Sequence, residues 1–512
     1  MRKNIIVILL MLLVLVGCQE KSEFQIVVDK IDKNVINDYA LLETFNEQKI
    51  TWYLNDELIN NEIPYFYTTE DVEYSLKGVL EDGSEAKTNI TIKKTNFVTD
   101  FVVKTNDKAA INSKDDYVKG KVSLTNSAYF DFSERTMKIK GRGNSTWQYD
   151  KKPYKIKFDD RISILGMKNA KEYVLLAEHN DKSLMRNYVA HYMSTFLKIG
   201  YTLDTRYVNL IINDEYKGLY LLTEQVEVDK NKLNLELNEK ADSGFLIELE
   251  RDYTRVLGEG TEGEDWFRLN NPGTSLRNNG DQEVYYVIKD PDTEDYSKEE
   301  VKAKISYYKK YFTEFQESVI NNKYEEFIDV DSFIDYFVLT ELMKQVDIGY
   351  SSVYINKDTN GKMRMGPIWD FDISSGNGNY YAYGPKGFWN DYNPWFDILI
   401  SNTKFQKAFI KRFNEVMNLY FDKVMSEIDR VNNHILNSAL RNFNYWSMFG
   451  LDEGKFDPNP TEMKNILSYN GQVKYLKDYL RTRKEWLVTN LNDKGYFGYL
   501  DRKDEGFDVI DK

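Results

Sequence analysis

The sequence predicts an α+β fold in two lobes, preceded by a small β-sandwich. Three observations lead to this prediction. The 512 residues are 42% hydrophobic and 14% aromatic, enough to bury more than one core. Short segments rich in β-branched and aromatic residues fill the first half of the chain, whereas long amphipathic helical patterns dominate beyond residue 295. Strands followed by helices are typical of an α+β arrangement, and two such lobes would enclose a cleft.

The first 18 residues predict a lipoprotein signal peptide. Two basic residues precede an apolar run that ends at Val16, and the run is too short to span a bilayer as a helix of roughly 20 residues. The segment Leu15-Val16-Gly17-Cys18 resembles the bacterial lipobox, in which the cysteine is lipidated and becomes the new N-terminus. Because two acyl chains anchor a protein stably, we expect Cys18 to hold the mature protein at the extracytoplasmic face of the cell membrane.

Residues 19–23 are expected to form a polar tether, and residues 24–95 the β-sandwich. Turn residues such as Asp82-Gly83 separate short segments with a high β-propensity. The expected strands are Phe24–Val28, Lys49–Leu54, Val72–Leu76 and Thr88–Ile92. A small sandwich of this kind would act as a spacer between the membrane and the rest of the chain.

Residues 96–495 are expected to form the main domain, followed by a C-terminal tail over residues 496–512. The expected strands of the main domain are 136–140, 154–158, 207–212 and 218–222. The expected helices are 183–198, 299–320, 331–344, 403–436 and 471–490.

Residue counts exclude several classes of function. The chain has 68 basic and 82 acidic residues, a net charge of −14, which makes nucleic acid an unfavourable partner. One cysteine and three histidines exclude a disulfide framework, a cysteine-rich zinc site and a multi-histidine metal cluster. Any metal ion must therefore be held mostly by carboxylates.

Three aspartates are the strongest candidates for chemistry. Asp347 follows an apolar helix, and Asp370 and Asp372 end the segment Gly366-Pro-Ile-Trp-Asp-Phe-Asp. An Asn-Gly turn at Asn360-Gly361 predicts a hairpin between them, which would bring the aspartates to the same end of the ribbon. Converging carboxylates suit a hard cation such as Mg²⁺ or Mn²⁺, whose usual partner is phosphate. The other interpretation is that these aspartates only cap exposed turns.

Five sequence blocks occur in an order that resembles the CotH family, the spore-coat CotH-like atypical protein kinases. The blocks are Gly141-Arg-Gly-Asn-Ser-Thr-Trp147, Lys151-Lys-Pro-Tyr-Lys-Ile-Lys157, Asp181-Lys-Ser-Leu-Met-Arg-Asn187, Asn213-Asp-Glu-Tyr-Lys-Gly-Leu-Tyr-Leu-Leu-Thr-Glu-Gln225 and Trp369-Asp-Phe-Asp372. The resemblance covers roughly residues 100–490 and not the expected β-sandwich.

The resemblance implies a bilobal protein-kinase-like fold, with ATP and Mg²⁺ or Mn²⁺ as cofactors. Phosphoryl transfer needs a cation on the phosphates, a carboxylate for the acceptor hydroxyl and a basic side chain on the phosphates. By resemblance, Asp347 matches the catalytic aspartate and Asp370 the metal-binding aspartate. Asp372 is a second metal ligand or supports Asp370.

The resemblance also implies residues that would contact the nucleotide. Lys155 or Lys157 would contact phosphate, and the residues alone do not decide between them, nor against a solvated strand face. Arg142 lies in a glycine-containing turn that would approach phosphates or form only a tight hairpin. Arg186 would clamp a phosphate or a carboxylate, or form a salt bridge on a helix surface. Glu224 would belong to a hinge strand whose backbone meets adenine.

Two features depart from familiar kinases. Ser352 stands five residues after Asp347, where those enzymes have a metal-binding asparagine, and a hydroxyl is a weaker cation ligand than an amide oxygen. Either Asp372 takes over the second cation, or one cation binds, or the site is degenerate. The turn at Gly141 also lacks the third glycine of a Gly-x-Gly-x-x-Gly loop.

The sequence leaves three functional hypotheses. The first is a membrane-anchored kinase that phosphorylates serine or threonine of an envelope or coat protein. The second is a non-catalytic, pseudokinase-like surface module that binds a protein or glycan and assembles the envelope, for which the aromatic residues between 376 and 396 are candidates. The third, a carboxylate-metal phosphodiesterase or glycosyl-phosphate enzyme, shares the aspartate chemistry but not the order of the blocks.

Overall fold

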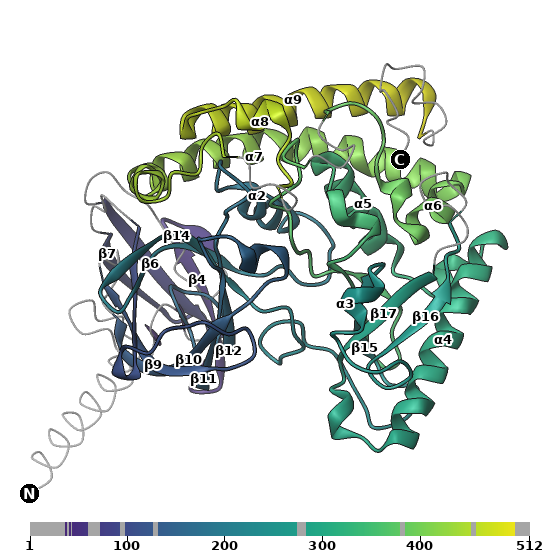
Figure 1. The fold of residues 1–512 in the computed structure, drawn as a ribbon, viewed down its shortest axis with the longest axis horizontal. Helices are drawn as coiled ribbons and strands as arrows, with labels where there is room; N and C mark the ends of the chain where they lie inside the picture. Colours follow the sequence, from purple (N-terminus) through teal and green to yellow (C-terminus); the bar gives the residue numbers. More distant parts are fainter. Residues whose placement is uncertain are drawn as a thin grey trace, which may run out of the picture.

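The computed structural model describes residues 36–37, 40–41, 44–59, 72–92, 98–125, 132–273, 283–378, 384–451 and 457–496. It has the predicted α+β composition: a small N-terminal sheet, a β-barrel, a second sheet and a set of long helices (Figure 1). The expected signal peptide with Cys18, the tether, the strand Phe24–Val28 and the tail beyond residue 496 lie outside these ranges. None of the helices within these ranges combines the length and the hydrophobicity that a membrane crossing requires.

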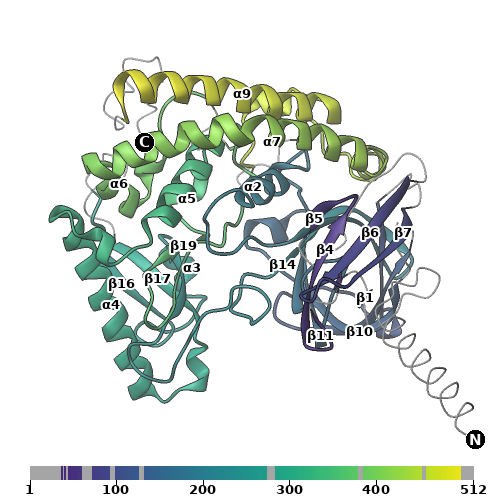
Figure 2. The ribbon, with the colours of Figure 1, turned by 180° about the vertical axis from the view of Figure 1, so that it is seen from behind.

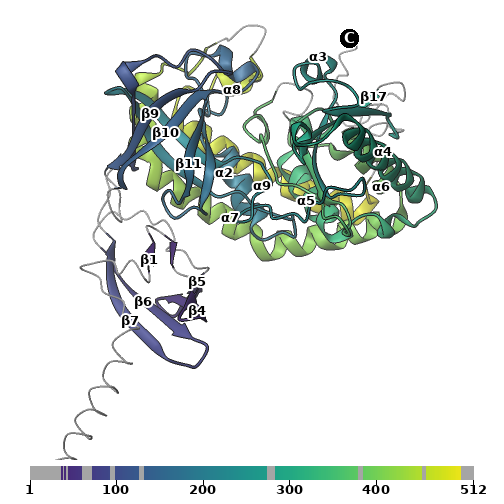
Figure 3. The same cartoon turned by 90° about the horizontal axis from the view of Figure 1, so that it is seen from below.

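The N-terminal strands form an antiparallel sheet with its own small core. The strands are β3 (Thr44–Phe45), β4 (Gln48–Leu54), β5 (Glu57–Ile59), β6 (Val72–Leu80) and β7 (Glu85–Ile92), in the order β3-β4-β6-β7 with β5 paired to β4. A two-stranded ribbon, β1 (Ile36–Asn37) with β2 (Ala40–Leu41), accompanies them. Trp52 is fully buried at the centre of this core, and the sheet lies apart from the barrel in Figure 3.

The barrel is a closed sheet of seven strands. They are β8 (Asp100–Thr105), β9 (Val118–Thr125), β10 (Phe132–Gly141), β11 (Tyr154–Ile162), β12 (Ala170–Leu176), β13 (Thr205–Ile212) and β14 (Glu215–Glu224). The order around the barrel is β10-β11-β12-β14-β13-β8-β9, and β13 with β8 is the parallel pair among them. Side chains alternate across the barrel wall, so that Ile139 and Ile156 pack inside while the lysines beside them point outward.

The second sheet is antiparallel, in the order β16-β17-β15-β18-β19. Its strands are β15 (Phe245–Glu250), β16 (Trp266–Asn270), β17 (Glu283–Asp290), β18 (Val353–Lys357) and β19 (Arg364–Met365). Helix α4 (Lys298–Ile320) packs on β16 and α5 (Val330–Met343) on β19, while the short α3 (Tyr253–Val256) follows β15.

Helix α7 (Thr403–Tyr445) connects the barrel to the second sheet. It contacts β14 of the barrel and also α2 (Arg186–Ser194), α5, α6 (Pro394–Ile400) and α9 (Tyr469–Lys494) (Figures 1 and 2). Asn402 caps its first turn by accepting from two backbone N–H groups. The remaining short helices are α8 (Thr461–Lys464) and the 3₁₀ turns 106–108, 145–148, 293–295, 324–326, 346–349 and 390–392.

Candidate active site

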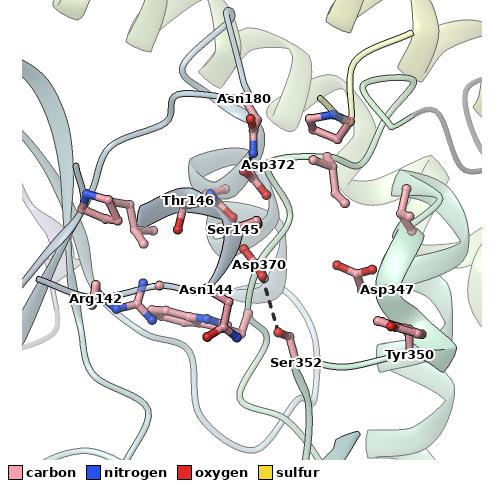
Figure 4. Close-up of a pocket in the computed structure, with 18 of the residues that line it drawn as sticks. Arg142, Asn144, Ser145, Thr146, Asn180, Asp347, Tyr350, Ser352, Asp370 and Asp372 are labelled. Carbon is pink, nitrogen blue, oxygen red and sulfur yellow. Dashed lines mark hydrogen bonds between the residues drawn. The ribbon is translucent and has the colours of Figure 1, made fainter. Parts of the chain in front are cut away.

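A cavity of about 1220 Å³ lies between the barrel and the second sheet (Figure 4). Its walls come from the loop between β10 and β11, the segments that follow β12 and β14, the segment from β15 to α3, the turn after α5 and the segment after β19. Five of the predicted site residues line it, from three of these walls: Arg142, Asp347, Ser352, Asp370 and Asp372.

The β10–β11 loop forms a tight turn that brings Arg142 into the cavity. Gly143 has a φ of +86°, and a Cβ atom there would lie 2.1 Å from Thr146 Oγ1, so the turn requires glycine. The Arg142 guanidinium lies over the Trp369 ring at 5.2 Å from its centroid. Removal from water lowers the pKa of Arg142, which Asp370 partly opposes. The loop is therefore both a tight hairpin and part of the cavity wall.

The predicted hairpin brings Ser352 and Asp370 to one end of the ribbon. Strands β18 and β19 pair antiparallel on either side of the turn at Gly361. Ser352 Oγ then lies 3.4 Å from Asp370 Oδ2, the contact drawn in Figure 4. Both residues have left-handed backbones, with φ of 60° and 63°. The predicted hairpin is therefore present between Asp347 and Asp370, and both aspartates line the cavity.

Helix α2 holds the Asp370 loop through two residues. The fully buried Arg186 pairs with Asp181 and donates to the carbonyl oxygens of Ser374 at 2.9 Å and Ser375 at 3.2 Å. Arg186 does not line the cavity and is fully buried, so it is neither a phosphate clamp nor a surface salt bridge. Its pairing with the buried Asp181 agrees with the third alternative, a carboxylate clamp.

The neighbouring residue, Asn187, contacts the segment Asp370-Phe-Asp372 directly. Its Oδ1 accepts from the backbone N–H of Phe371 at 2.6 Å, and its Nδ2 donates to Glu178 Oε1 at 3.0 Å. Gln345 donates to the carbonyl oxygen of Trp369 at 3.3 Å from the other side. The sequence did not indicate these roles, although Asn187 stands in one of the five blocks.

Asp347 faces the cavity from the turn after α5, and its pKa is strongly shifted. Burial, and secondly the charge of Asp370, raises the pKa of Asp347 to about 7, while Arg255 opposes the shift. Arg255 Nη1 donates to Ser351 Oγ at 3.0 Å and lies 3.7 Å from Glu250 Oε2. Arg255 lines the cavity, but no sequence motif marks it.

Carboxylates outnumber basic side chains in the cavity. Seven acidic residues line it against Arg142, Arg255 and Lys289, and Lys289 already pairs with Glu248 and Glu259. Burial, followed by nearby carboxylates, raises the pKa of Asp372 well above its usual range and that of Glu178 to about 8. A bound cation would stabilise the ionised form of such a cluster of buried carboxylates.

The donor set around Asp370 fits a hard cation. Asp370 and Asp372 supply carboxylate oxygens, and Ser352 Oγ lies beside Asp370 as a neutral oxygen. Asn180 donates its Nδ2 to Asp372 Oδ2 at 3.3 Å. In the described part of the chain, no three acidic, histidine or cysteine side chains gather closely enough to enclose a metal ion. Two carboxylates completed by substrate phosphates and water are the usual environment of Mg²⁺.

Three predicted contacts lie outside the cavity. Lys155 and Lys157 point outward from β11 and pair with Glu172, at 2.8 Å for Lys157. Glu224 is buried at the end of β14, where it accepts from Tyr201 Oη at 2.7 Å. Burial, and secondly Asp204, raises the pKa of Glu224 to about 8. Glu224 does not line the cavity, whereas the two residues that follow it, Gln225 and Val226, do.

The aromatic stretch after Asp372 belongs mostly to the core. Phe388, Trp395 and Phe396 are fully buried, whereas Trp389 and Tyr392 line the cavity. Residues 379–383 lie outside the described residues. The described aromatic residues therefore form no exposed binding face.

Residues 139–487 match the model of a protein family described as CotH kinase protein. The match covers more than half of the chain and includes the strands from β10 onward and all the cavity residues named above. No curated protein matches the sequence.

Proposed function

The chain belongs to the CotH family, and on that premise we propose that it is a kinase that transfers the γ-phosphoryl group of ATP to a serine or threonine of an envelope or coat protein. The observation that carries this proposal is the cavity, which gathers Asp347, Asp370 and Arg142. These residues match the three requirements of phosphoryl transfer: an acceptor base, a metal ligand and a basic side chain. In the proposal, the barrel is the small lobe of an atypical bilobal protein-kinase-like fold.

An apolar part of the cavity supports adenine binding. Leu176, Val226, Tyr354 and Trp369 line it and belong to one hydrophobic cluster. A flat base would be held there by stacking and burial, close to where β14 leaves the barrel. Arg142 lies on the Trp369 ring and would reach the phosphates, taking the role first assigned to Lys155 or Lys157.

Asp370 and Asp372 would hold Mg²⁺ or Mn²⁺. The bound cation would neutralise the charge that develops on the phosphate oxygens. Ser352 Oγ already lies beside Asp370, so it would orient that carboxylate or add a neutral ligand.

Asp347 is the proposed base for the acceptor hydroxyl. A carboxyl with a pKa of about 7 is half-ionised at neutral pH, which suits it to accept a proton. The acceptor oxygen forms a bond to the γ-phosphorus while the bond to the bridging oxygen of ADP breaks. The hydroxyl proton moves to Asp347, and ADP leaves.

The proposed setting is the extracytoplasmic face of the cell membrane, with Cys18 as the lipidated residue. This anchor rests on the lipobox resemblance of the sequence. Mass spectrometry of the protein purified from a lipoprotein-processing bacterium should find a diacylglyceryl group on Cys18, and Cys18→Ser should release the protein from the membrane.

A second candidate, a non-catalytic module, is favoured by one observation. Ser352 stands where familiar kinases have a metal-binding asparagine. Its hydroxyl contacts Asp370 and is a weaker cation ligand than an amide oxygen. This candidate predicts nucleotide or partner binding without turnover. The burial of Phe388, Trp395 and Phe396 removes most of the described aromatic residues that would have formed its glycan-binding face.

The test is phosphate incorporation from γ-labelled ATP into envelope protein, with Mg²⁺ or Mn²⁺. Asp370→Ala should lose at least about a hundredfold in rate, as expected for a residue needed for chemistry. Asp331→Ala, which removes an exposed carboxylate of α5 that pairs with Lys198, is the matched control and should keep the rate. Equal incorporation by Asp370→Ala and the native protein would contradict the assignment. Cation-dependent ATP binding without incorporation would favour the non-catalytic module.

A further inference from the structure

The outer face of the barrel carries lysines that the proposed reaction does not use. They lie on four adjacent strands, β8, β9, β10 and β11, and point away from the barrel core. This lysine face consists of Lys104, Lys119, Lys121, Lys138, Lys140, Lys155 and Lys157. None of these side chains lines the cavity.

The strand register places these lysines directly opposite one another. Lys119 faces Lys138 across β9 and β10, and Lys138 faces Lys157 across β10 and β11. Two further opposed pairs are Lys104 with Lys121 and Lys140 with Lys155. Because directly opposed side chains lie only about 5 Å apart at Cβ, like charges there destabilise the sheet. Four such pairs weaken the barrel unless an anionic partner covers them.

Carboxylates offset only part of this charge. Glu134 pairs with Lys121 at 2.6 Å, and Asp159 lies 3.8 Å from Lys138. Glu172 forms salt bridges with both Lys155 and Lys157. Within the described ranges, no carboxylate pairs with the remaining three, Lys104, Lys119 and Lys140. The face is therefore positive on a protein whose net charge is −14.

We propose that the lysine face docks on the anionic phospholipid headgroups of a membrane. A broad sheet face without a pocket suits an extended charged surface better than a discrete ligand. Lysine, a point charge on a flexible stem, suits mobile headgroups, whereas arginine is typical of fixed bidentate phosphate sites. The strongly acidic remainder of the molecule is repelled by the same surface, so the barrel is turned toward the bilayer.

Vesicle binding by the chain beginning at Gln19, which keeps every described residue, tests this docking. The variant is Lys104→Glu/Lys138→Glu/Lys140→Glu, in which each new carboxylate lies opposite at least one remaining lysine. The matched control carries the same charge change on α4: Lys298→Glu/Lys302→Glu/Lys310→Glu, at three exposed positions. The probes are vesicles of phosphatidylcholine alone and with 30% phosphatidylglycerol, the fraction being on the order of that in anionic membranes.

The native protein should bind the vesicles that contain phosphatidylglycerol and should not bind the vesicles of phosphatidylcholine alone. Each lysine near an anionic surface contributes about fivefold in partitioning, so the barrel variant, which loses three lysines and gains three carboxylates, should lose at least on the order of a hundredfold. The α4 variant should stay close to native. The barrel variant should also melt at a temperature no lower than native, because its new cross-strand pairs attract, which separates lost binding from misfolding.

Three results would overturn the proposal: equal binding to neutral vesicles, equal losses in the two variants, or binding to soluble polyphosphate without binding to vesicles. Phosphate incorporation should be unchanged in the barrel variant when the acceptor is soluble, since these lysines lie outside the cavity. The docking and the proposed kinase activity are therefore tested independently.

Discussion

The role of Asp347 depends on neighbours of opposite charge. Burial and Asp370 favour the protonated carboxyl, while Arg255 favours the ionised form. The balance leaves a pKa of about 7, at which the group can both accept and release a proton near neutral pH. If Asp347 is the base, Arg255 therefore tunes it from α3, where it contacts Ser351 close to Asp347 in the chain, without belonging to any recognisable motif.

The pH dependence of phosphate transfer should report this balance. Because the base works in its ionised form, kcat/KM should rise with pH through about 7 and level off above it. Arg255→Ala removes the charge that lowers the pKa of Asp347, so the rise should move to higher pH. Arg255→Lys keeps the charge and should restore the native profile. A uniform loss at every pH, with the midpoint unmoved, would show that Arg255 acts only as a structural residue.

Glu178 should make the native protein less stable as pH rises. Its pKa is raised from 4.5 to about 8 by burial and by Asp181, so the folded state keeps a proton that the unfolded chain releases between these pH values. Stability is then lost with rising pH at up to about 1.4 kcal/mol per pH unit. Glu178→Gln should gain stability relative to native from pH 4.5 to 8, measured by urea unfolding.

The matched control for that measurement is Glu299→Gln, which changes an exposed carboxylate of α4. It should follow the native protein at every pH. If the difference between Glu178→Gln and native does not change with pH, the carboxyl is ionised in both states and the cation argument built on it fails.

The position of the aspartates in the cavity wall could be predicted from sequence, but the position of Lys155 and Lys157 outside the cavity could not. Asp347 and Asp370 flank a hairpin with an Asn-Gly turn, so local chemistry alone brings them together. Lys155 and Lys157 share a strand face, and alternation predicts that correctly. Alternation does not say which side of a sheet faces the cleft, and here that face points to solvent and Glu172.

Among the secondary-structure elements, α2 positions the loop that carries Asp370 and Asp372. Arg186 and Asn187 occupy its first turn, and their side chains hold residues 371–375 by hydrogen bonds to the backbone of that loop. The loop has a left-handed residue at Asp370, which these contacts keep in place. The helix, and not the cavity surface, thus fixes where the carboxylates point.

Asn187→Ala should weaken both the fold and the cation site. It leaves the Phe371 N–H and the Glu178 carboxyl without their partner, which costs about 1–3 kcal/mol of unfolding free energy. Mn²⁺ should stabilise the variant against heat less than it stabilises native protein. Asn414→Ala, at an exposed position of α7, is the control and should change neither quantity. Undiminished stabilisation by Mn²⁺ in Asn187→Ala would contradict the positioning role of α2.

The helices could be predicted closely, whereas the barrel could not. The amphipathic patterns place α4 and α5 within about one residue of their observed bounds, because the spacing of apolar residues predicts which face of a helix is buried. The prediction for α9 begins two residues late and ends four residues early. Closure of the barrel requires β13 to pair in parallel with β8, a strand roughly a hundred residues earlier. No local pattern in the sequence predicts that β8 and β13 pair.

At the scale of the whole molecule, helix α7 makes one unit of the barrel and the second sheet. It packs against β14 and α2 on the barrel side and against α5, α6 and α9 on the other. The cavity lies between the parts that this helix connects, so its walls keep their spacing without direct strand pairing (Figures 1 and 4). The N-terminal sheet has a separate core and contributes no residue to the cavity.

The most direct test of the central claim is calorimetry of ATP binding, with and without Mg²⁺ or Mn²⁺, on the native protein and on Asp370→Ala. We expect ATP binding to require the cation and to be lost in Asp370→Ala. The acidic cavity admits a triphosphate only when a cation held by Asp370 offsets the negative charge of the carboxylates and phosphates. Binding that is equally strong without a cation, or unchanged in Asp370→Ala, would contradict the assignment of this cavity as a nucleotide site.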